Sequence, residues 1–181
     1  MRTVIVVGNP KPRSRTRAAA ENLLERLGLP PAEVIELSEL GPGLLGWGDP
    51  AVKEAVALVQ SADVAVIASP TFKATYSGLL KLFLDQFAGG TGLQGVVAVP
   101  LMLSAAPQHF LAADLTLKPV LVELGGLCAV PGLHQLDSAF LDDPALDAWT
   151  ARWAPVITAL AALPATADPA TAAPSGRTPA P

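Results

Sequence analysis

The chain has 181 residues, of which 51% are hydrophobic and 15% are charged, and its formal net charge is −4. This length suits one compact domain with a buried core, and the charge offers no basic surface for a nucleic acid. No apolar stretch approaches the roughly 20 residues that a bilayer span requires, so we expect neither a nucleic acid nor a membrane as partner.

The first half of the chain alternates strand-like and helix-like segments. Residues 3–7 are a continuous β-branched run, which is typical of a strand buried on both faces of a parallel sheet. This run begins without the long apolar core and cleavage site of a secretion signal, so we expect a cytoplasmic protein. The elements predicted next are a helix over 14–27, a short strand over 33–37 and a helix over 50–61 with a proline in its first turn.

The second half continues the alternation. Residues 63–68, DVAVIA, predict a third strand, and the loop SPTFKATYSG leads from it into a helix over 79–87. Residues 164–181 include no large apolar residue, so we expect a disordered tail after a single domain over 1–163. The other predicted elements are a strand over 96–101, a helix over 108–124 interrupted at Pro119, a strand over 127–130 and a closing helix over 144–163.

This alternation predicts a three-layer α/β/α domain with a five-stranded parallel sheet, because each parallel connection needs a crossover helix. The expected strand order is 2-1-3-4-5. In such sheets a ligand binds beyond the carboxyl ends of the strands, where the winding direction reverses between the first and third strands. The loops at that point are GNPKPRSRT, residues 8–16, and SPTFKATYSG, residues 69–78.

The first loop has the features of an anion site. It enters a helix whose free N–H groups and dipole favour a negative charge. Asn9, Ser14 and Thr16 supply short donors, and Lys11 or Arg15 can add charge. The P-loop and dinucleotide patterns are both absent, which favours a single terminal phosphate. The alternative is that Ser14 only caps the helix and the cations are a solvated surface.

Three stretches together resemble the NADPH-dependent FMN reductase family, and most closely its members that serve alkanesulfonate monooxygenases. The similarity runs over most of the chain, from about residue 2 to residue 160. It implies a flavodoxin-like fold that binds FMN, transfers hydride from NADPH or NADH to flavin N5, and supplies reduced FMN to a partner flavin-dependent monooxygenase. The three stretches are GNPKPRSRT, SPTFKATYSGLLKLFLDQF and HFLAADLTLKPVL.

The resemblance also implies roles for individual residues. Lys73 would stabilise the anion that reduced flavin becomes, and the hydride step itself needs no acid, base or nucleophile. Tyr76 and Ser77 would support the second loop, with Tyr76 either stacking on a ring or holding the turn through its hydroxyl. The residues implied to surround the FMN phosphate are Asn9, Lys11, Ser14, Arg15 and Thr16, and those implied to line the isoalloxazine are Pro70, Thr71, Phe72 and Lys73.

The turn after the fourth strand departs from the family pattern. Leu103-Ser104-Ala105-Ala106 stands where a Thr-Gly-Gly-Thr-like turn normally approaches the flavin with its backbone. Ser104 is the flavin contact that we expect from this turn. Because alanine tolerates a positive φ poorly, we expect a less close approach than in the family.

Other functions stay open at this stage. They are an FMN-bound reductase of quinones, azo compounds or metal oxyanions, a flavodoxin-type electron carrier, and a non-catalytic flavin-binding subunit. The helices over 79–87 and 110–124 carry more apolar surface than one sheet face requires, which predicts a homodimer or homotetramer with the flavin site near the subunit interface. The single cysteine, Cys128, lies in the apolar run LCAV, so we expect it to be a small buried residue of the core. Its distance in sequence from His109 and His134 does not match the spacing of metal ligands.

Overall fold

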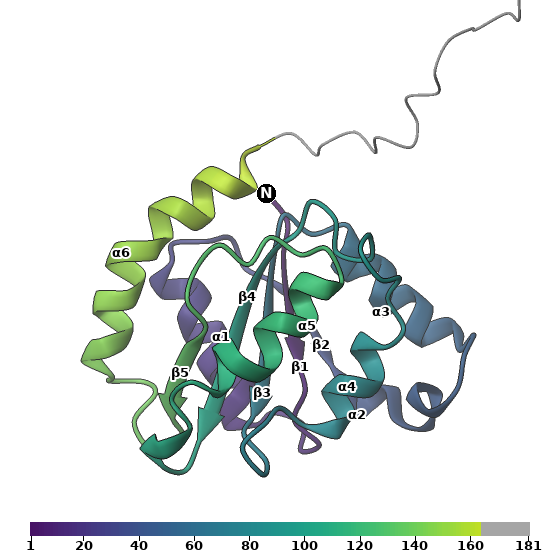
Figure 1. Ribbon diagram of the computed structural model, residues 1–181, viewed down its shortest axis with the longest axis horizontal. Coiled ribbons are helices and arrows are strands. Elements are labelled where there is room, and N and C mark those ends of the chain that lie inside the picture. The colour runs from purple at the N-terminus through teal and green to yellow at the C-terminus, as the bar shows by residue number, and fades with distance from the viewer. Residues whose placement is uncertain (164–181) are drawn as a thin grey trace, which may run out of the picture.

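The computed structural model describes residues 1–163, which form a five-stranded sheet flanked by helices (Figure 1). Neighbouring strands are all parallel, in the order β2-β1-β3-β4-β5. The predicted flavodoxin-like α/β/α fold and its strand order are therefore confirmed. The tail predicted over 164–181 lies outside the described residues. The strands are β1 (Thr3–Val7), β2 (Glu33–Glu36), β3 (Val64–Pro70), β4 (Val97–Ser104) and β5 (Leu133–Leu136).

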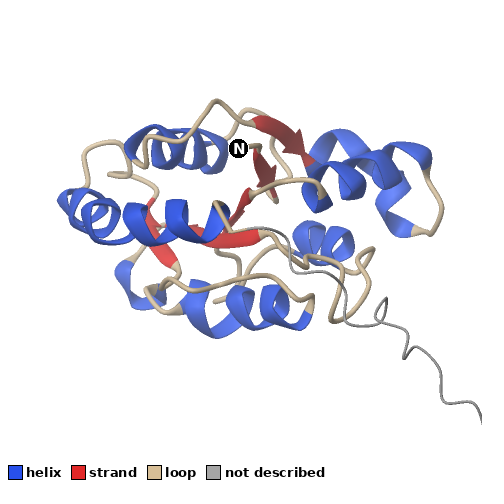
Figure 2. Cartoon of the chain, turned by 90° about the horizontal axis from the view of Figure 1, so that it is seen from above, coloured by secondary structure: helices blue, strands red, loops and turns tan. Residues whose placement is uncertain are grey.

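Helices cover both faces of the sheet, as the view from above shows (Figure 2). Alternate residues of β1 point to opposite sides, so Val4 packs in one core cluster and Ile5 in the other. The first cluster lies under α3, α4 and α5, and the second lies under α1 and α6. The main helices are α1 (Arg15–Arg26), α3 (Pro50–Gln60), α4 (Gly78–Leu84), α5 (Lys118–Glu123) and α6 (Pro144–Ala161).

The local sequence explains where these helices begin. Ser14 caps α1, and its hydroxyl accepts a hydrogen bond from the N–H of Arg17 at 3.4 Å. Asp49 caps α3 by accepting from the N–H of Ala51 at 2.9 Å, with Pro50 at the first helical position, where no N–H is needed. None of the helices described within residues 1–163 combines the length and apolar character needed to cross a membrane.

The predicted position of the fifth strand was wrong. Residues 127–130 contribute only a single bridge, between Leu127 and Val97, and residues 128–130 are unpaired. The strand itself is Leu133–Leu136, four residues that alternate between buried and half-buried because this strand lies at the edge of the sheet. The prediction chose LCAV because that run is more apolar than LHQL.

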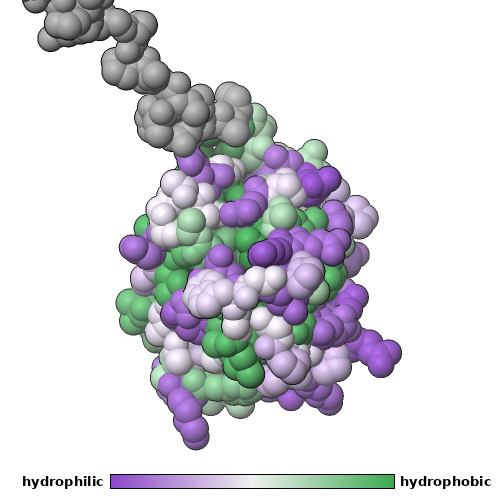
Figure 3. Space-filling view, turned by 90° about the vertical axis from the view of Figure 1, so that its right-hand side faces the viewer, coloured by the Kyte–Doolittle hydropathy of each residue, from purple (hydrophilic) through white to green (hydrophobic). Residues whose placement is uncertain are grey.

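Two other segments differ from the sequence-based expectation. The helix predicted over 108–124 is a 3₁₀ turn at Pro107–His109, a π-helical turn at Ala113–Leu117 and then α5, which has a proline at its start. The glycine- and proline-rich segment after β2 contains a short helix α2 (Leu37–Leu40) and a 3₁₀ turn at Gly41–Leu45. Figure 3 shows the side of the molecule where α3 lies, with apolar side chains interspersed among polar ones.

Candidate functional site

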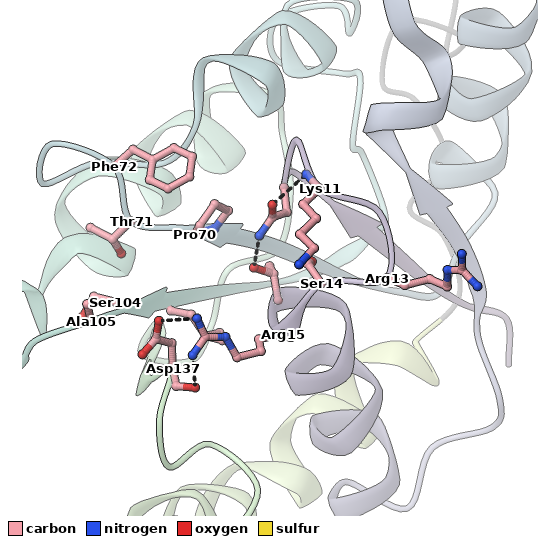
Figure 4. A pocket seen from close by; sticks show the side chains of 13 residues that line it. Lys11, Arg13, Ser14, Arg15, Pro70, Thr71, Phe72, Ser104, Ala105 and Asp137 are labelled. Atoms are coloured by element: carbon pink, nitrogen blue, oxygen red, sulfur yellow. Dashed lines mark hydrogen bonds and ion pairs between the residues drawn. The ribbon is translucent and has the colours of Figure 1, made fainter.

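A cavity of about 340 Å³ lies at the carboxyl ends of the strands, between the loops that follow β1, β3 and β4 (Figure 4). This is where the winding of the sheet reverses, and the volume falls in the range of small-molecule sites. The cavity is therefore the candidate site. Its lining residues are Asn9, Lys11, Arg13, Ser14, Arg15, Thr16, Pro70, Thr71, Phe72, Leu103, Ser104, Ala105 and Asp137.

The first loop is held in shape by its own side chains. The amide of Asn9 donates to the hydroxyl of Thr16 at 2.9 Å and accepts from the N–H of Lys11, also at 2.9 Å. Ser14 and Thr16 are buried, whereas the side chain of Lys11 is exposed. The loop thus presents a cation and the N-terminal end of α1 to the same cavity, which is the arrangement that binds phosphate.

Glu36, at the end of β2, is a residue that the sequence reading missed. It is buried, and its Oε1 accepts from the N–H of Arg13 at 2.9 Å and from the Arg17 guanidinium at 3.4 Å. Arg13 has a φ of 50°, an unusual value for a residue other than glycine. Glu36 therefore stabilises the strained part of the first loop. The position of Glu36 at the carboxyl end of the second predicted strand could have indicated this.

The second loop forms a tight hairpin next to the cavity. The N–H of Phe72 donates to the carbonyl of Thr75 at 2.8 Å, and the N–H of Thr75 donates back at 3.2 Å. Lys73 and Ala74 form the tip and have φ values of 52° and 68°, as in a type I′ turn. The tip points Lys73 into solvent, whereas Phe72, 50% exposed, stands at the rim of the cavity.

Thr71 lines the cavity at the base of this hairpin. Its N–H donates to the carbonyl of Leu103 at 2.6 Å, which ties the second loop to β4. Its hydroxyl oxygen is buried and has no hydrogen-bond partner within the described chain. A buried hydroxyl of this kind costs free energy unless something bonds to it, so Thr71 marks a place for a polar edge of a ligand.

Ser77 joins the first and second loops beneath the cavity. Its hydroxyl donates to the carbonyl of Gly8 and accepts from the N–H of Leu80 at 3.1 Å, so it also caps α4. The N–H of Ser77 donates to the hydroxyl of Ser69 at 2.9 Å. A side chain at Gly8 would meet Leu80 of α4 at 2.7 Å, so glycine lets the start of the first loop approach α4 this closely.

The third loop, residues 103–106, lines the cavity without the backbone conformation expected of a glycine turn. Within residues 1–163, the positive φ values at residues other than glycine are all in the first two loops, and Ala106 has a φ of −151°. The hydroxyl of Ser104 donates to the carbonyl of Ala106 at 2.6 Å and lies 2.6 Å from Nε2 of His134. Because the hydroxyl hydrogen is already used, His134 donates through Nε2.

His134 was also missed, because no sequence pattern around it indicates a function. It lies on β5, next to β4. Burial lowers the pKa of His134, the neighbouring His109 lowers it further, and Asp143 acts in the opposite direction. The neutral ring therefore acts as a hydrogen-bond donor that holds the third loop in place.

Asp137 closes the remaining side of the cavity, directly after β5. Its carboxylate lies 3.2 Å from a guanidinium nitrogen of Arg15, and its carbonyl accepts from the other terminal nitrogen at 3.2 Å (Figure 4). The N–H of Asp137 donates to the carbonyl of Ser104 at 3.0 Å. The sequence reading missed Asp137 because it ended the fifth strand too early in the chain.

The structure brings most of the predicted site residues to one cavity. Lys73 and Ser77 do not line it, since Lys73 lies at the hairpin tip and Ser77 lies beneath the loops. Tyr76 is partly buried against the core cluster under α4 and does not line the cavity. Within residues 1–163, no group of His, Cys, Asp or Glu side chains could hold a metal ion. The predicted residues that line the cavity are Asn9, Lys11, Ser14, Arg15, Thr16, Pro70, Thr71, Phe72 and Ser104.

This arrangement has a polar end and a flat apolar end. The polar end has the N–H groups of α1 and Lys11, as a terminal phosphate requires. The apolar end has Pro70, the ring of Phe72 and the unpartnered hydroxyl of Thr71, which suit a planar heteroaromatic ring with polar edges. The fold defines a flavodoxin-like protein, and the cavity at its switch point is a candidate mononucleotide site.

Comparison with known proteins identifies the family. The model of the family described as NADPH-dependent FMN reductase matches residues 1–139. The chain is 35% identical over 147 residues to the FMN reductase (NADPH) of Escherichia coli strain K12, covering 78% of this chain and 76% of that protein. It is 27% identical to the NADH-dependent FMN reductase SfnF of Pseudomonas putida, over 77% of this chain and 80% of that protein.

Solved structures agree with this assignment. The apo form of the NADH:FMN oxidoreductase EMOB superposes with a TM-score of 0.74 at 29% identity, covering 93% of this chain and 92% of that one. The chain therefore belongs to the NADPH-dependent FMN reductase family. It is an oxidoreductase whose reaction uses FMN and a reduced nicotinamide nucleotide.

Proposed function

We propose that this reductase supplies reduced FMN to a partner flavin-dependent monooxygenase. The observation that carries the reductase assignment is the single cavity that joins a phosphate-binding loop to an aromatic rim. When bound, FMN accepts a hydride from NADPH or NADH at N5. The task of the protein is then to orient the two rings and exclude water from between them.

Different residues of the cavity would bind the phosphate and the ring of FMN. Asn9, Ser14 and Thr16 fix the first loop so that the main-chain N–H groups and Lys11 meet the phosphate. Phe72 offers its half-exposed ring to a planar group, and the hydroxyl of Thr71 is free to bond to a polar edge. Arg15, Pro70 and Ser104 complete the lining.

Lys73 is proposed to stabilise the reduced flavin from the hairpin tip. Its left-handed backbone conformation costs free energy in a residue other than glycine, and such strain often occurs at functional loops. An ammonium group near the flavin N1 and C2 carbonyl would favour the anion of the reduced form. Lys73 follows Phe72 in the chain but points into solvent and does not line the cavity, so this role requires its side chain to turn toward the rim when the flavin binds.

The test is the oxidation of NADPH and of NADH by the purified chain, with and without added FMN. Turnover that requires free FMN and saturates with it supports the proposal. Turnover of a quinone, azo compound or metal oxyanion without added FMN would favour a reductase that keeps its flavin bound. FMN binding without oxidation of either nucleotide would favour an electron carrier or a non-catalytic subunit. No binding of FMN at all would contradict the proposal.

Two variants test the residue roles. Phe72→Ala should weaken the binding of FMN and of riboflavin alike, because the ring contact is common to both. Lys73→Met should lower the reduction potential of bound FMN, because it removes a charge that favours the reduced anion. Lys53→Met is the matched control, since Lys53 is exposed on α3 and does not line the cavity.

We also propose a homodimer or homotetramer assembled through the segment after β4. Phe110, Leu111, Leu115 and Val122 are all exposed there, from the start of this segment to α5. Large apolar side chains gathered on one segment are typical of a protein interface. Light scattering after size-exclusion chromatography should show an assembly at micromolar concentration, and a monomer would contradict this proposal.

A further inference from the structure

We propose that Asp137 sets the strength of FMN binding by competing with the flavin phosphate for Arg15. This inference rests on the proposed function. It assigns Asp137 a role in weakening the affinity of the site, although the residue lines the same cavity as the phosphate loop.

The contacts of Arg15 show how strongly it is already engaged. One terminal nitrogen of the guanidinium lies 3.2 Å from the carboxylate of Asp137, and the other donates to the Asp137 carbonyl at 3.2 Å. Both ends of the planar fork are therefore used by one residue (Figure 4). A phosphate at the start of α1 therefore has to displace Asp137 before it can bind the edge of the guanidinium that carries the two terminal nitrogens.

The backbone keeps Asp137 in position during this competition. The N–H of Asp137 donates to the carbonyl of Ser104 at 3.0 Å, which extends the β4–β5 pairing by one step. The carboxylate is the less exposed partner, at 28% against 64% for Arg15. Arg15 is thus the partner that is free to move, and Asp137 is the fixed one.

The charge of Asp137 is a second reason to expect that this residue weakens FMN binding. The carboxylate of Asp137 lines the cavity and would repel a phosphate that carries up to two negative charges. Lys11 makes no ion pair within residues 1–163, so it stays available to the phosphate. The site therefore attracts the phosphate with Lys11 and the helix N-terminus and opposes it with Asp137. Weak binding of this kind suits a flavin that must leave after reduction.

The test compares two flavins that differ only at the phosphate. Binding of FMN and of riboflavin to the full chain is measured by the quenching of flavin fluorescence, for wild type and for Asp137→Asn. We expect Asp137→Asn to bind FMN about two- to fivefold more tightly, the range set by an exposed ion pair, and to bind riboflavin as the wild type does. Asp142→Asn is the control for charge, because Asp142 is exposed nearby and does not line the cavity.

A second pair of variants isolates the role of Arg15. In an Arg15→Gln background, Asp137→Asn should tighten FMN binding by a smaller factor, because only the direct repulsion remains to be removed. Asp137→Ser, a second neutral replacement that keeps the main-chain contacts, should behave as Asp137→Asn does.

The outcomes separate this inference from the proposed function. Unchanged or weaker FMN binding in both Asp137 variants would overturn the inference while the proposed function stands. An equal gain for FMN and riboflavin would also overturn it, since the effect would not then involve the phosphate. Failure of every variant and of the wild type to bind FMN would overturn the proposed function, and the inference with it.

Discussion

Ser77→Ala should destabilise the fold and loosen the cavity at the same time. The substitution removes the cap of α4, a loss of about 1 kcal/mol, and leaves the carbonyl of Gly8 without its buried donor, at about 1–3 kcal/mol. The sum is about 2–4 kcal/mol. For a chain of this size it corresponds to a fall in Tm of about 5–15 °C.

The assay is urea denaturation at 25 °C, together with FMN titration. Ser38→Ala is the contrasting control, because the Ser38 hydroxyl is buried without a hydrogen-bond partner, so its removal should not lower the free energy of unfolding. FMN binding should weaken in Ser77→Ala because Ser77 fixes the distance between the two loops. A loss of stability below about 1 kcal/mol, or an equal loss in the control, would refute this reasoning.

Three further predictions concern groups around the site. Glu36→Ala should destabilise the chain by about 1–3 kcal/mol in urea and weaken FMN binding, because the N–H of Arg13 loses its acceptor; Glu36→Gln, which keeps an acceptor oxygen, should lose less. His134→Gln keeps an N–H donor for Ser104 but does not titrate. Folding lowers the pKa of His134, so the unfolded chain binds the proton more tightly than the folded chain does. The wild type should therefore lose stability as the pH falls below about 6.5, and it should lose more than the variant does. Burial raises the pKa of Cys128 from 9.0 to about 11, although Lys118 lowers it slightly, so alkylation at pH 8 should be about a hundredfold slower in the folded chain than in urea. The folded thiol holds its proton more tightly, so this contribution to stability should decline as the pH rises above about 9, and equal alkylation rates would contradict the shift.

The central strands could be predicted because strands buried on both faces appear in the sequence as continuous apolar runs. All residues of β1 and β3 are buried, and their β-branched runs mark them without any tertiary information. The edge strand β5 lacks this signal, since half of its residues are only partly buried. Because the fifth strand was predicted at the wrong residues, Asp137, which follows β5, was not predicted to line the cavity.

The loops of the cavity were predictable, but the side chains that hold them were not. Topology alone places residues 8–16 and 69–78 at the switch point. Glu36 and His134, in contrast, act on loops far away in the sequence, and their partners follow only from the packing of neighbouring strands. Sequence spacing carries no information about such contacts, so they emerge only with the structure.

The third loop shows how a chain can replace a glycine turn. The expectation that alanine would keep this loop away from the ligand assumed that the loop needs a positive φ. The structure avoids that conformation, and Leu103, Ser104 and Ala105 still line the cavity. The hydrogen bonds from Ser104 to Ala106 and from His134 to Ser104 fix the turn by side-chain contacts instead. His134 therefore holds the third loop at the wall of the cavity through its bond to Ser104.

The cations in and after the first loop attract a phosphate less strongly than their number in the sequence suggests. Arg15 is paired with Asp137, and Arg17 is paired with both Glu21 and Glu36. Arg13 points away from the centre of the cavity in Figure 4, which leaves Lys11 as a cation that lines the cavity and makes no ion pair within residues 1–163. The main-chain N–H groups at the start of α1 are then the other source of attraction for a phosphate. A modest affinity, lowered by Asp137 as proposed above, would suit a reductase whose reduced flavin is released to a partner.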